Sequence, residues 1–255
     1  MAGNEIIFEL RDGLATITLN RPEKLNSLTV DLFRQLETCV AKIEAAPEQF
    51  GCVVLRGAGP CFSAGNDLKQ IHDGDALPYP NFQSLIIERL GNLPIPVIAA
   101  VHGHCYTGAL ELALSSDIIL ASSDAKFADT HGKWGMVPIW GMSQRLPRRV
   151  GRARAAEIMF TSRTYTGEEA AAIGLANACF PAERFDAEVA AFCDLILKNS
   201  WFSHRGNKSF LRDTEGMDLA SGLAHEIVHH PGLDPQMNER IAAFLSKKKP
   251  LEQVK

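Results

Sequence analysis

Three residues of the chain offer groups suited to proton transfer or to the stabilisation of a negative oxygen: Gly108, Glu111 and His131. The run GALELALS (108–115) predicts a short helix that begins at Gly108. The N–H of Gly108 would then lack an intrahelical partner at the positive end of the helix, where it can stabilise a negatively charged oxygen. Glu111 follows one helical turn later between apolar neighbours. We therefore favour a buried carboxylate with a raised pKa over one that caps the helix or faces solvent.

His131 lies in the polar stretch FADTHGKWGMVP (127–138). A histidine exchanges protons near neutral pH, so His131 could serve as a second acid or base. The alternative is an exposed turn residue beside Gly132 and Lys133, because lone histidines are more often structural. Asp129 is a fallback for the same role.

A third glycine-containing stretch, CFSAGNDL (61–68), follows a predicted buried strand. Glycine allows the backbone to approach a ligand closely. On this stretch alone, a strand-to-helix turn with Asp67 near the start of a helix is the simpler interpretation.

Residues 225–229 read HEIVH and match the helical H-E-x-x-H motif of zinc proteases. So short a motif arises often by chance, and no third ligand or protease pattern accompanies it. We rank metal-dependent hydrolysis well below acid/base chemistry and expect no metal site.

Composition excludes several classes of partner. The 255 residues are 46% hydrophobic and carry a net charge of -4, which gives no basic footprint for a nucleic acid. The one basic run, residues 247–249, is predicted to be a solvated tail. The N-terminal residues show no secretory signal, and no apolar run has the length of a membrane helix. We expect six buried free thiols and a cytoplasmic location, with cysteines at positions 39, 52, 61, 105, 179 and 193.

Hydrophobic periodicity predicts an α/β protein. An Asp-Gly turn joins two strands into a hairpin, Thr29 is the predicted N-cap of a long helix, and Thr166 with Glu169 forms a capping box. Strands are predicted at 6–10, 14–19, 52–55, 97–101, 117–121 and 126–128, and helices at 29–45, 82–91, 108–115, 185–198, 203–213, 219–229 and 235–246.

Six motifs in this order resemble the crotonase (enoyl-CoA hydratase/isomerase) superfamily over about residues 5–249. They are LNRPEKLNSL (19–28), FSAGNDL (62–68), PVIAAVHGHCYTGALELALSSDIILAS (96–122), GMSQRLPRRVG (141–151), YTGEEAAAIGLANACFP (165–181) and ERIAAFLSKKKP (239–250). The resemblance implies a spiral of ββα turns over residues 1–200. It also implies a helical C-terminal region, 201–255, that forms trimers, often paired into hexamers. One continuous domain is the alternative.

The resemblance further implies a coenzyme A thioester as substrate and no separate cofactor. The backbone N–H groups that polarise the thioester carbonyl and stabilise an enolate match Asn66 and Gly108. Two segments would cradle coenzyme A; their residues are Lys24, Leu25, Ala64, Gly65, Asn66, Asp67 and Leu68.

Hydratases of this family use two glutamates around one water. Glu111 matches the first, whereas the second position falls on His131. The glutamate that isomerases place near the following proline is absent too, since Ile139 follows Pro138.

The leading hypothesis is an enzyme that stabilises a thioester enolate while it adds water to a 2-enoyl-CoA. Isomerisation, decarboxylation or C–C cleavage on the same oxyanion site is one alternative. A non-catalytic acyl-CoA-binding or scaffolding protein is another. Tyr106, Trp134 and Trp140 are candidates for the acyl pocket or, equally, for core packing.

Overall fold

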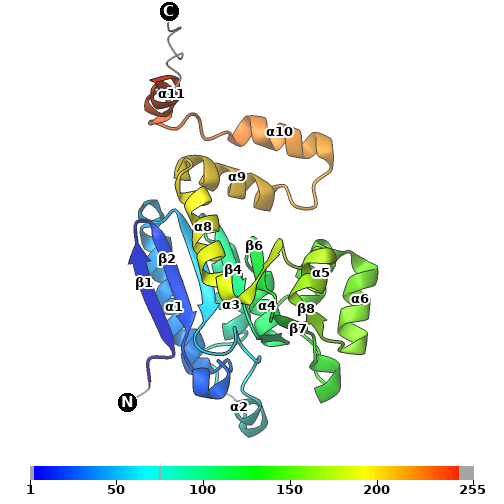
Figure 1. Cartoon of the computed structure of the whole chain (residues 1–255). Coiled ribbons are helices and arrows are strands. Elements are labelled where there is room, and N and C mark those ends of the chain that lie inside the picture. Colours follow the sequence, from blue (N-terminus) through cyan, green and yellow to red (C-terminus); the bar gives the residue numbers. More distant parts are fainter. Residues whose placement is uncertain (1–2, 75, 247–255) are drawn as a thin grey trace, which may run out of the picture. The chain divides into compact units, whose positions relative to one another are not determined.

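The computed structural model describes residues 3–74 and 76–246. Its centre is a six-stranded sheet in the order β1-β2-β3-β4-β6-β9 (Figure 1). β1 is antiparallel to β2, and every later pairing in this sheet is parallel. The strands are β1 (Ile6–Arg11), β2 (Leu14–Leu19), β3 (Cys52–Gly57), β4 (Val97–Val101), β6 (Ile118–Ser122) and β9 (Ala178–Phe180).

The predicted hairpin is confirmed. Asp12 and Gly13 both have positive φ, 49° and 84°, as a two-residue hairpin turn requires. Arg11 pairs with Leu14 directly across this turn.

The two faces of the sheet bury alternate residues of each parallel strand. Val53 and Leu55 point into the core that contains α1 (Val30–Ala45) and α3 (Phe82–Gly91). Cys52 and Val54 point to the opposite face, which α8 (Phe185–Leu197) covers (Figure 1). The predicted N-cap of α1 is confirmed, because the hydroxyl of Thr29 accepts the N–H of Leu32.

A second, smaller sheet has the order β5-β7-β8. β5 (His104–Tyr106) runs parallel to β7 (Lys126–Ala128), and β8 (Tyr165–Thr166) is antiparallel to β7. α4 (Gly108–Leu114) begins two residues after β5 ends. The candidate residues Gly108, Glu111 and His131 follow strands of this small sheet and not of the large one.

Four further helices complete the first of two compact units, which ends at Lys198. They are α2 (Leu68–Asp73), α5 (Met142–Val150), α6 (Arg152–Thr161) and α7 (Gly167–Ala172). Both hydrogen bonds of the predicted capping box at the start of α7 are present, a feature that contributes about 1 kcal/mol.

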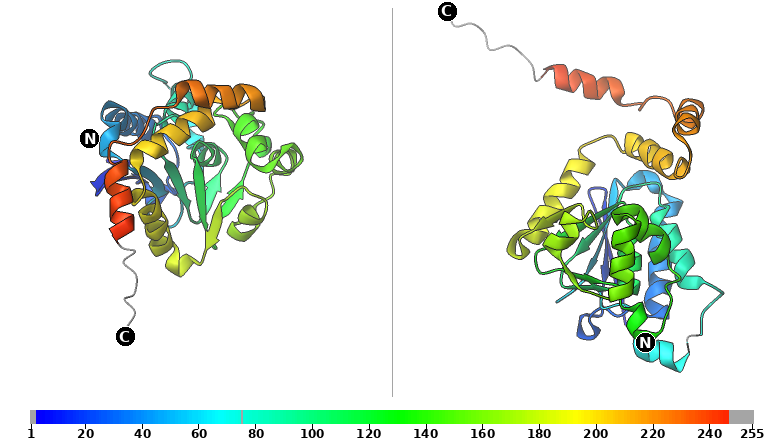
Figure 2. Two further views of the ribbon diagram at one scale, coloured as in Figure 1. Left: turned by 90° about the horizontal axis from the view of Figure 1, so that it is seen from above. Right: turned by 90° about the vertical axis from the view of Figure 1, so that its right-hand side faces the viewer.

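The second unit begins at Asn199 and contains α9 (Trp201–Asp213), α10 (Leu219–His229) and α11 (Met237–Ser246), which follow one another as separate helices (Figure 2). All three fall in the predicted helical region. Within the described ranges, no helix of either unit is long and apolar enough to cross a membrane. The basic run at 247–249 lies outside the described residues.

All six cysteines are free thiols, as predicted. Five are buried and Cys179 is half-buried, so their side chains serve packing.

Candidate active site

The candidate site is assembled where two parallel strands of the small sheet end. Tyr106 at the end of β5 pairs with Ala128 at the end of β7. Because the carboxyl ends of parallel neighbours meet at one edge, the segment that starts α4 meets the segment that follows β7. A hydrogen bond of 2.8 Å from Thr107 N–H to Ala128 O joins the two segments directly.

Glu111 is buried beneath this edge and only 1% exposed. Its Oε1 accepts the backbone N–H groups of Trp140 at 2.8 Å and Met142 at 3.0 Å. Burial raises the pKa of this carboxyl above its ordinary value, and the N–H of Met142 and the nearby His131 offset part of the rise. The predicted buried carboxylate is therefore confirmed, and the capping and solvent-facing alternatives are wrong.

His131 begins a short 3-10 helix (His131–Trp134) and turns its ring towards Glu111. Its Nε2 lies 3.6 Å from Glu111 Oε2. Its Nδ1 lies 2.6 Å from Asp129 Oδ1, and that same oxygen accepts the His131 backbone N–H at 3.0 Å. Because an ionised carboxylate only accepts, Nδ1 donates, and Nε2 is the nitrogen left to exchange a proton with Glu111.

This geometry changes the predicted roles of the polar stretch. His131 is buried, so the exposed-turn alternative is wrong. Asp129 does not face Glu111 as a substitute base but holds the imidazole, as the aspartate does in an Asp-His pair of a catalytic triad.

The two candidate oxyanion donors are brought to the same place. Gly108 is the first residue of α4. The intrahelical hydrogen bonds begin with Glu111, whose N–H donates to Thr107 O, so the N–H of Gly108 lies before the first of them. Asn66 forms a parallel bridge with Leu28 in which Gly65 O and Asp67 N–H make the hydrogen bonds. Across the described part of the chain, neither the N–H of Asn66 nor that of Gly108 is used in a hydrogen bond.

Glycine is required at two points of this arrangement. Gly65 has φ of 99°, and a Cβ there would lie 2.7 Å from Tyr106 O. A Cβ on Gly108 would lie 2.6 Å from Asn66 Oδ1 and 2.7 Å from the ring of Trp140. A side chain at either position would therefore push the two N–H groups apart.

A cavity of about 330 Å³ opens beside these groups. His131 and Asn66 form part of its wall, and Tyr106, Trp134, Met136 and Leu68 give it an apolar character. Trp140 is not part of this wall; it is 6% exposed and packs edge-on against Phe33 with ring centroids 5.1 Å apart. Of the three aromatic candidates, two line the cavity and Trp140 belongs to the core.

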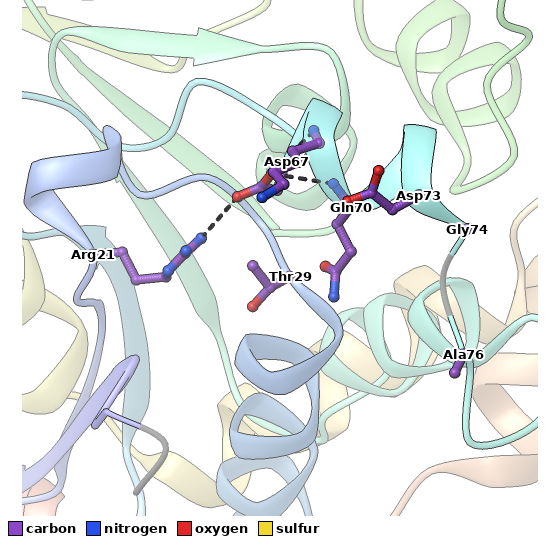
Figure 3. A pocket seen from close by; sticks show the side chains of 8 residues that line it. Arg21, Thr29, Asp67, Gln70, Asp73, Gly74 and Ala76 are labelled. Carbon is purple, nitrogen blue, oxygen red and sulfur yellow. Dashed lines mark hydrogen bonds and ion pairs between the residues drawn. The ribbon is translucent and has the colours of Figure 1, made fainter.

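The segments predicted to cradle coenzyme A also lie together. Ala64 N–H donates to Leu25 O at 2.9 Å, next to the 3-10 helix (Pro22–Lys24) that contains Lys24. Arg21 reaches from this side to Asp67, with Nη1 3.5 Å from the carboxylate (Figure 3).

Asp67 in turn caps α2 through the N–H groups of Lys69 and Gln70 (Figure 3). A second hollow, of about 340 Å³, lies beside this network. Arg21 was not predicted as a site residue. Its position in the RPEK motif, which ends at the predicted Lys24, could have indicated it.

The histidines of the HEIVH motif do not converge on a common centre. The rings of His225 and His229 stack with centroids 4.0 Å apart, and His229 Nδ1 contacts His225 O at 3.0 Å. No cluster of three or more potential metal ligands occurs within residues 3–74 and 76–246.

Glutamine at position 111 is expected to raise the stability of the protein at neutral pH. A carboxyl whose pKa is raised by folding favours the folded state less as the pH rises above its ordinary value of 4.5, because the charged form must then be buried. The melting temperature of Glu111→Gln should therefore exceed that of the wild type at pH 7 to 8, and the difference should shrink as the pH falls towards 4.5. A difference that does not depend on pH would contradict this origin.

Comparisons with known proteins identify the family of the chain. A family model described as enoyl-CoA hydratase/isomerase matches residues 9–253. The short-chain-enoyl-CoA hydratase of Clostridium acetobutylicum is 32% identical over 227 residues, which cover 88% of this chain and 87% of the relative. The 1,2-epoxyphenylacetyl-CoA isomerase of Escherichia coli is 30% identical over 254 residues, 96% of this chain and 97% of the relative.

The crystal structure of an enoyl-CoA hydratase from Bacillus anthracis matches the fold with a TM-score of 0.89 at 29% sequence identity. The match covers 97% of this chain and 98% of that one.

Proposed function

Because the chain belongs to the enoyl-CoA hydratase/isomerase family, we propose that it adds water across the C2=C3 bond of a 2-enoyl-CoA, with Glu111 and His131 as the acid/base pair. The observation that carries the proposal is the distance of 3.6 Å between Glu111 Oε2 and His131 Nε2. Both side chains are buried, and His131 lines the cavity. The resemblance implies two glutamates around one water, and in this proposal His131 takes the part of the second.

The unused N–H groups of Asn66 and Gly108 support the role of an oxyanion hole. In the proposed reaction they bind the thioester oxygen, on which negative charge develops as water attacks C3. Donors that are already fixed before the reaction stabilise this charge without having to reorganise.

Protons move between three groups in the proposed step. The attacking water binds Glu111 Oε2 and His131 Nε2; its oxygen bonds to C3 and its proton passes to Nε2, while Asp129 holds the ring. C2 of the enolate then takes a proton from the Glu111 carboxyl, whose pKa is raised above its ordinary value by burial. Transfer of the extra proton from His131 to Glu111 restores the starting state, so the net change is one added water.

Coenzyme A is proposed to bind as part of the substrate, and we propose no separate cofactor. The contact between Ala64 N–H and Leu25 O supports a cradle formed by two segments for its pantetheine arm and adenine. The contributing residues are Lys24, Leu25, Ala64, Gly65, Asn66, Asp67 and Leu68.

A steady-state assay tests the reaction. Loss of the enoyl thioester absorbance is followed with 2-enoyl-CoA substrates of 4 to about 16 carbons, and the 3-hydroxyacyl-CoA product is identified by mass spectrometry. Turnover at any chain length supports the proposal. Acyl-CoA binding without turnover at every length would overturn it and favour a binding protein.

Isomerisation is the second candidate, because an acid/base pair of this kind can move a proton between carbons without adding water. The similarity to an isomerase at 30% identity favours keeping it. Incubation in H₂¹⁸O separates the two, since only hydration places ¹⁸O in the product.

We also propose that the chain acts in the cytoplasm as a trimer or a dimer of trimers, with residues 199–246 in the subunit interface. Leu219, Leu223 and Ile227 recur at i, i+4 and i+8 on α10 and are 79%, 52% and 80% exposed. Such an apolar stripe suits association. Sedimentation equilibrium should give three or six chains per particle.

A further inference from the structure

Thr107, the residue between β5 and α4, has a strained backbone. Its φ and ψ are 55° and -112°. Glycine tolerates this region, whereas a β-branched residue there is an outlier that costs free energy and persists only when its surroundings hold it. Thr107 is also 8% exposed, so it is fixed inside the site and not at a free loop tip.

Four hydrogen bonds hold Thr107 in this conformation. Its N–H donates to Ala128 O at 2.8 Å, and its carbonyl accepts Glu111 N–H at 3.0 Å. Its Oγ1 shares a short hydrogen bond with Thr130 Oγ1 and accepts the N–H of Thr130 at 3.2 Å. The side chain that creates the strain is thus the side chain that is bound twice by Thr130.

The two threonines occupy matching places in the site. Thr107 immediately precedes Gly108, whose N–H is a proposed oxyanion donor, and Thr130 immediately precedes His131. Both line the cavity. A movement of either threonine would change the distance between the oxyanion donor and the base.

We propose that Thr107 and Thr130 form a positioning pair, which sets the oxyanion donor at Gly108 and the base at His131 in register with each other. The expected effect on catalysis rests on the proposed function. The contact between the two threonines is independent of it. Neither threonine transfers a proton in the reaction; each acts through the residue that follows it.

A purely structural role of Thr107 would favour a different residue at this position. If Thr107 only closed the turn, glycine would serve better, because it removes the strain and needs no partner. A positioning role explains why a strained threonine is kept at this place. Its hydroxyl ties the segment of the oxyanion donor, Gly108, to the segment of the base, His131.

The test compares variants that differ in the hydroxyl. Thr130→Val removes it while keeping the shape of the side chain, Thr130→Ser keeps it, and Thr107→Gly removes both the hydroxyl and the strain. We expect kcat for hydration to fall about 10- to 100-fold in Thr130→Val and Thr107→Gly, since a misplacement of the order of 1 Å has effects of this size. Thr130→Ser should stay close to the wild type.

Three further measurements separate positioning from folding. Binding of free coenzyme A, which has neither the thioester oxygen nor an acyl chain, should be unchanged in all variants. The melting temperature of Thr107→Gly should equal or exceed that of the wild type. The double variant Thr107→Gly/Thr130→Val should be no slower than the slower single variant, because both changes break the same contact.

Hydrogen exchange gives a readout that does not depend on activity. Exchange of residues 128–134, measured by mass spectrometry, should accelerate in Thr130→Val and Thr107→Gly but not in Thr130→Ser. If the wild type hydrates no 2-enoyl-CoA and exchange still follows this pattern, the proposed function fails while the pair stands. Unchanged exchange, or an active wild type whose kcat survives in Thr130→Val, would overturn the positioning pair.

Discussion

Glu111→Gln lowers kcat for hydration by about 10²- to 10⁴-fold, the range expected when a general acid/base is removed. Glutamine keeps a carbonyl oxygen in the place of Oε1, so the N–H groups of Trp140 and Met142 retain their acceptor. It cannot take up or release a proton at Oε2, which faces His131. The loss therefore reports the missing proton transfer and not a collapsed site.

Two measurements make this result specific. Butyryl-CoA should bind Glu111→Gln as tightly as the wild type, because the oxyanion donors are backbone groups that the substitution leaves in place. Glu48→Gln, at an exposed position, is the matched control and should retain full activity. Full activity of Glu111→Gln would remove the carboxyl from the mechanism.

Local sequence signals were sufficient for most of the fold. The Asp-Gly turn, the Thr29 cap and the capping box each depend on residues close in sequence, and each is present in the structure. Long helices such as α1 show a period of 3.6, and the parallel strands β3 and β4 are short continuous apolar runs because both faces of the sheet are covered.

The small sheet was only partly predictable for a physical reason. β5 and β8 have three and two residues, too short to show any period, and they are defined by their pairing with β7. Because β5 cannot be recognised in the sequence, the sequence predicts where α4 begins but not that this start lies beside the end of β7. The proximity of Glu111 to His131 follows from the register of β5 on β7, which pairs Tyr106 with Ala128.

Asp129 and His131 are close in sequence, yet the sequence suggested Asp129 as a fallback base and not as the partner of the His131 ring. An aspartate two residues before a histidine can bind both the backbone N–H and the ring, and it does so here. Sequence alone did not reveal which of the two side chains faces Glu111, because the turn after β7 decides the direction of both. Thr107 was missed because the sequence letter does not show a positive φ.

His131→Gln should lower kcat for hydration by about 10²-fold or more, since glutamine can bind the water but cannot take its proton. Stability should change little, because the side chain amide can still donate to Asp129. Measurement of kcat and of butyryl-CoA affinity separates the two effects. His72→Gln, at an exposed histidine, is the control.

Glutamate at position 131, the residue that the resemblance to hydratases leads us to expect there, should not restore an ordinary hydratase by itself. Asp129 Oδ1 lies 2.6 Å from His131 Nδ1, so His131→Glu would place a carboxylate against a buried carboxylate and close to that of Glu111. Such repulsion makes one carboxyl hold a proton and lowers stability. We expect His131→Glu to be less stable and at least as slow as His131→Gln.

The double variant His131→Glu/Asp129→Asn should recover both losses in part, because the amide of asparagine can donate to the new carboxylate. Recovery of kcat in the double variant but not in His131→Glu would establish that Asp129 and His131 work as one unit. If His131→Glu alone is as active and stable as the wild type, Asp129 does not set the chemistry of position 131, and the proposed role of this pair is wrong.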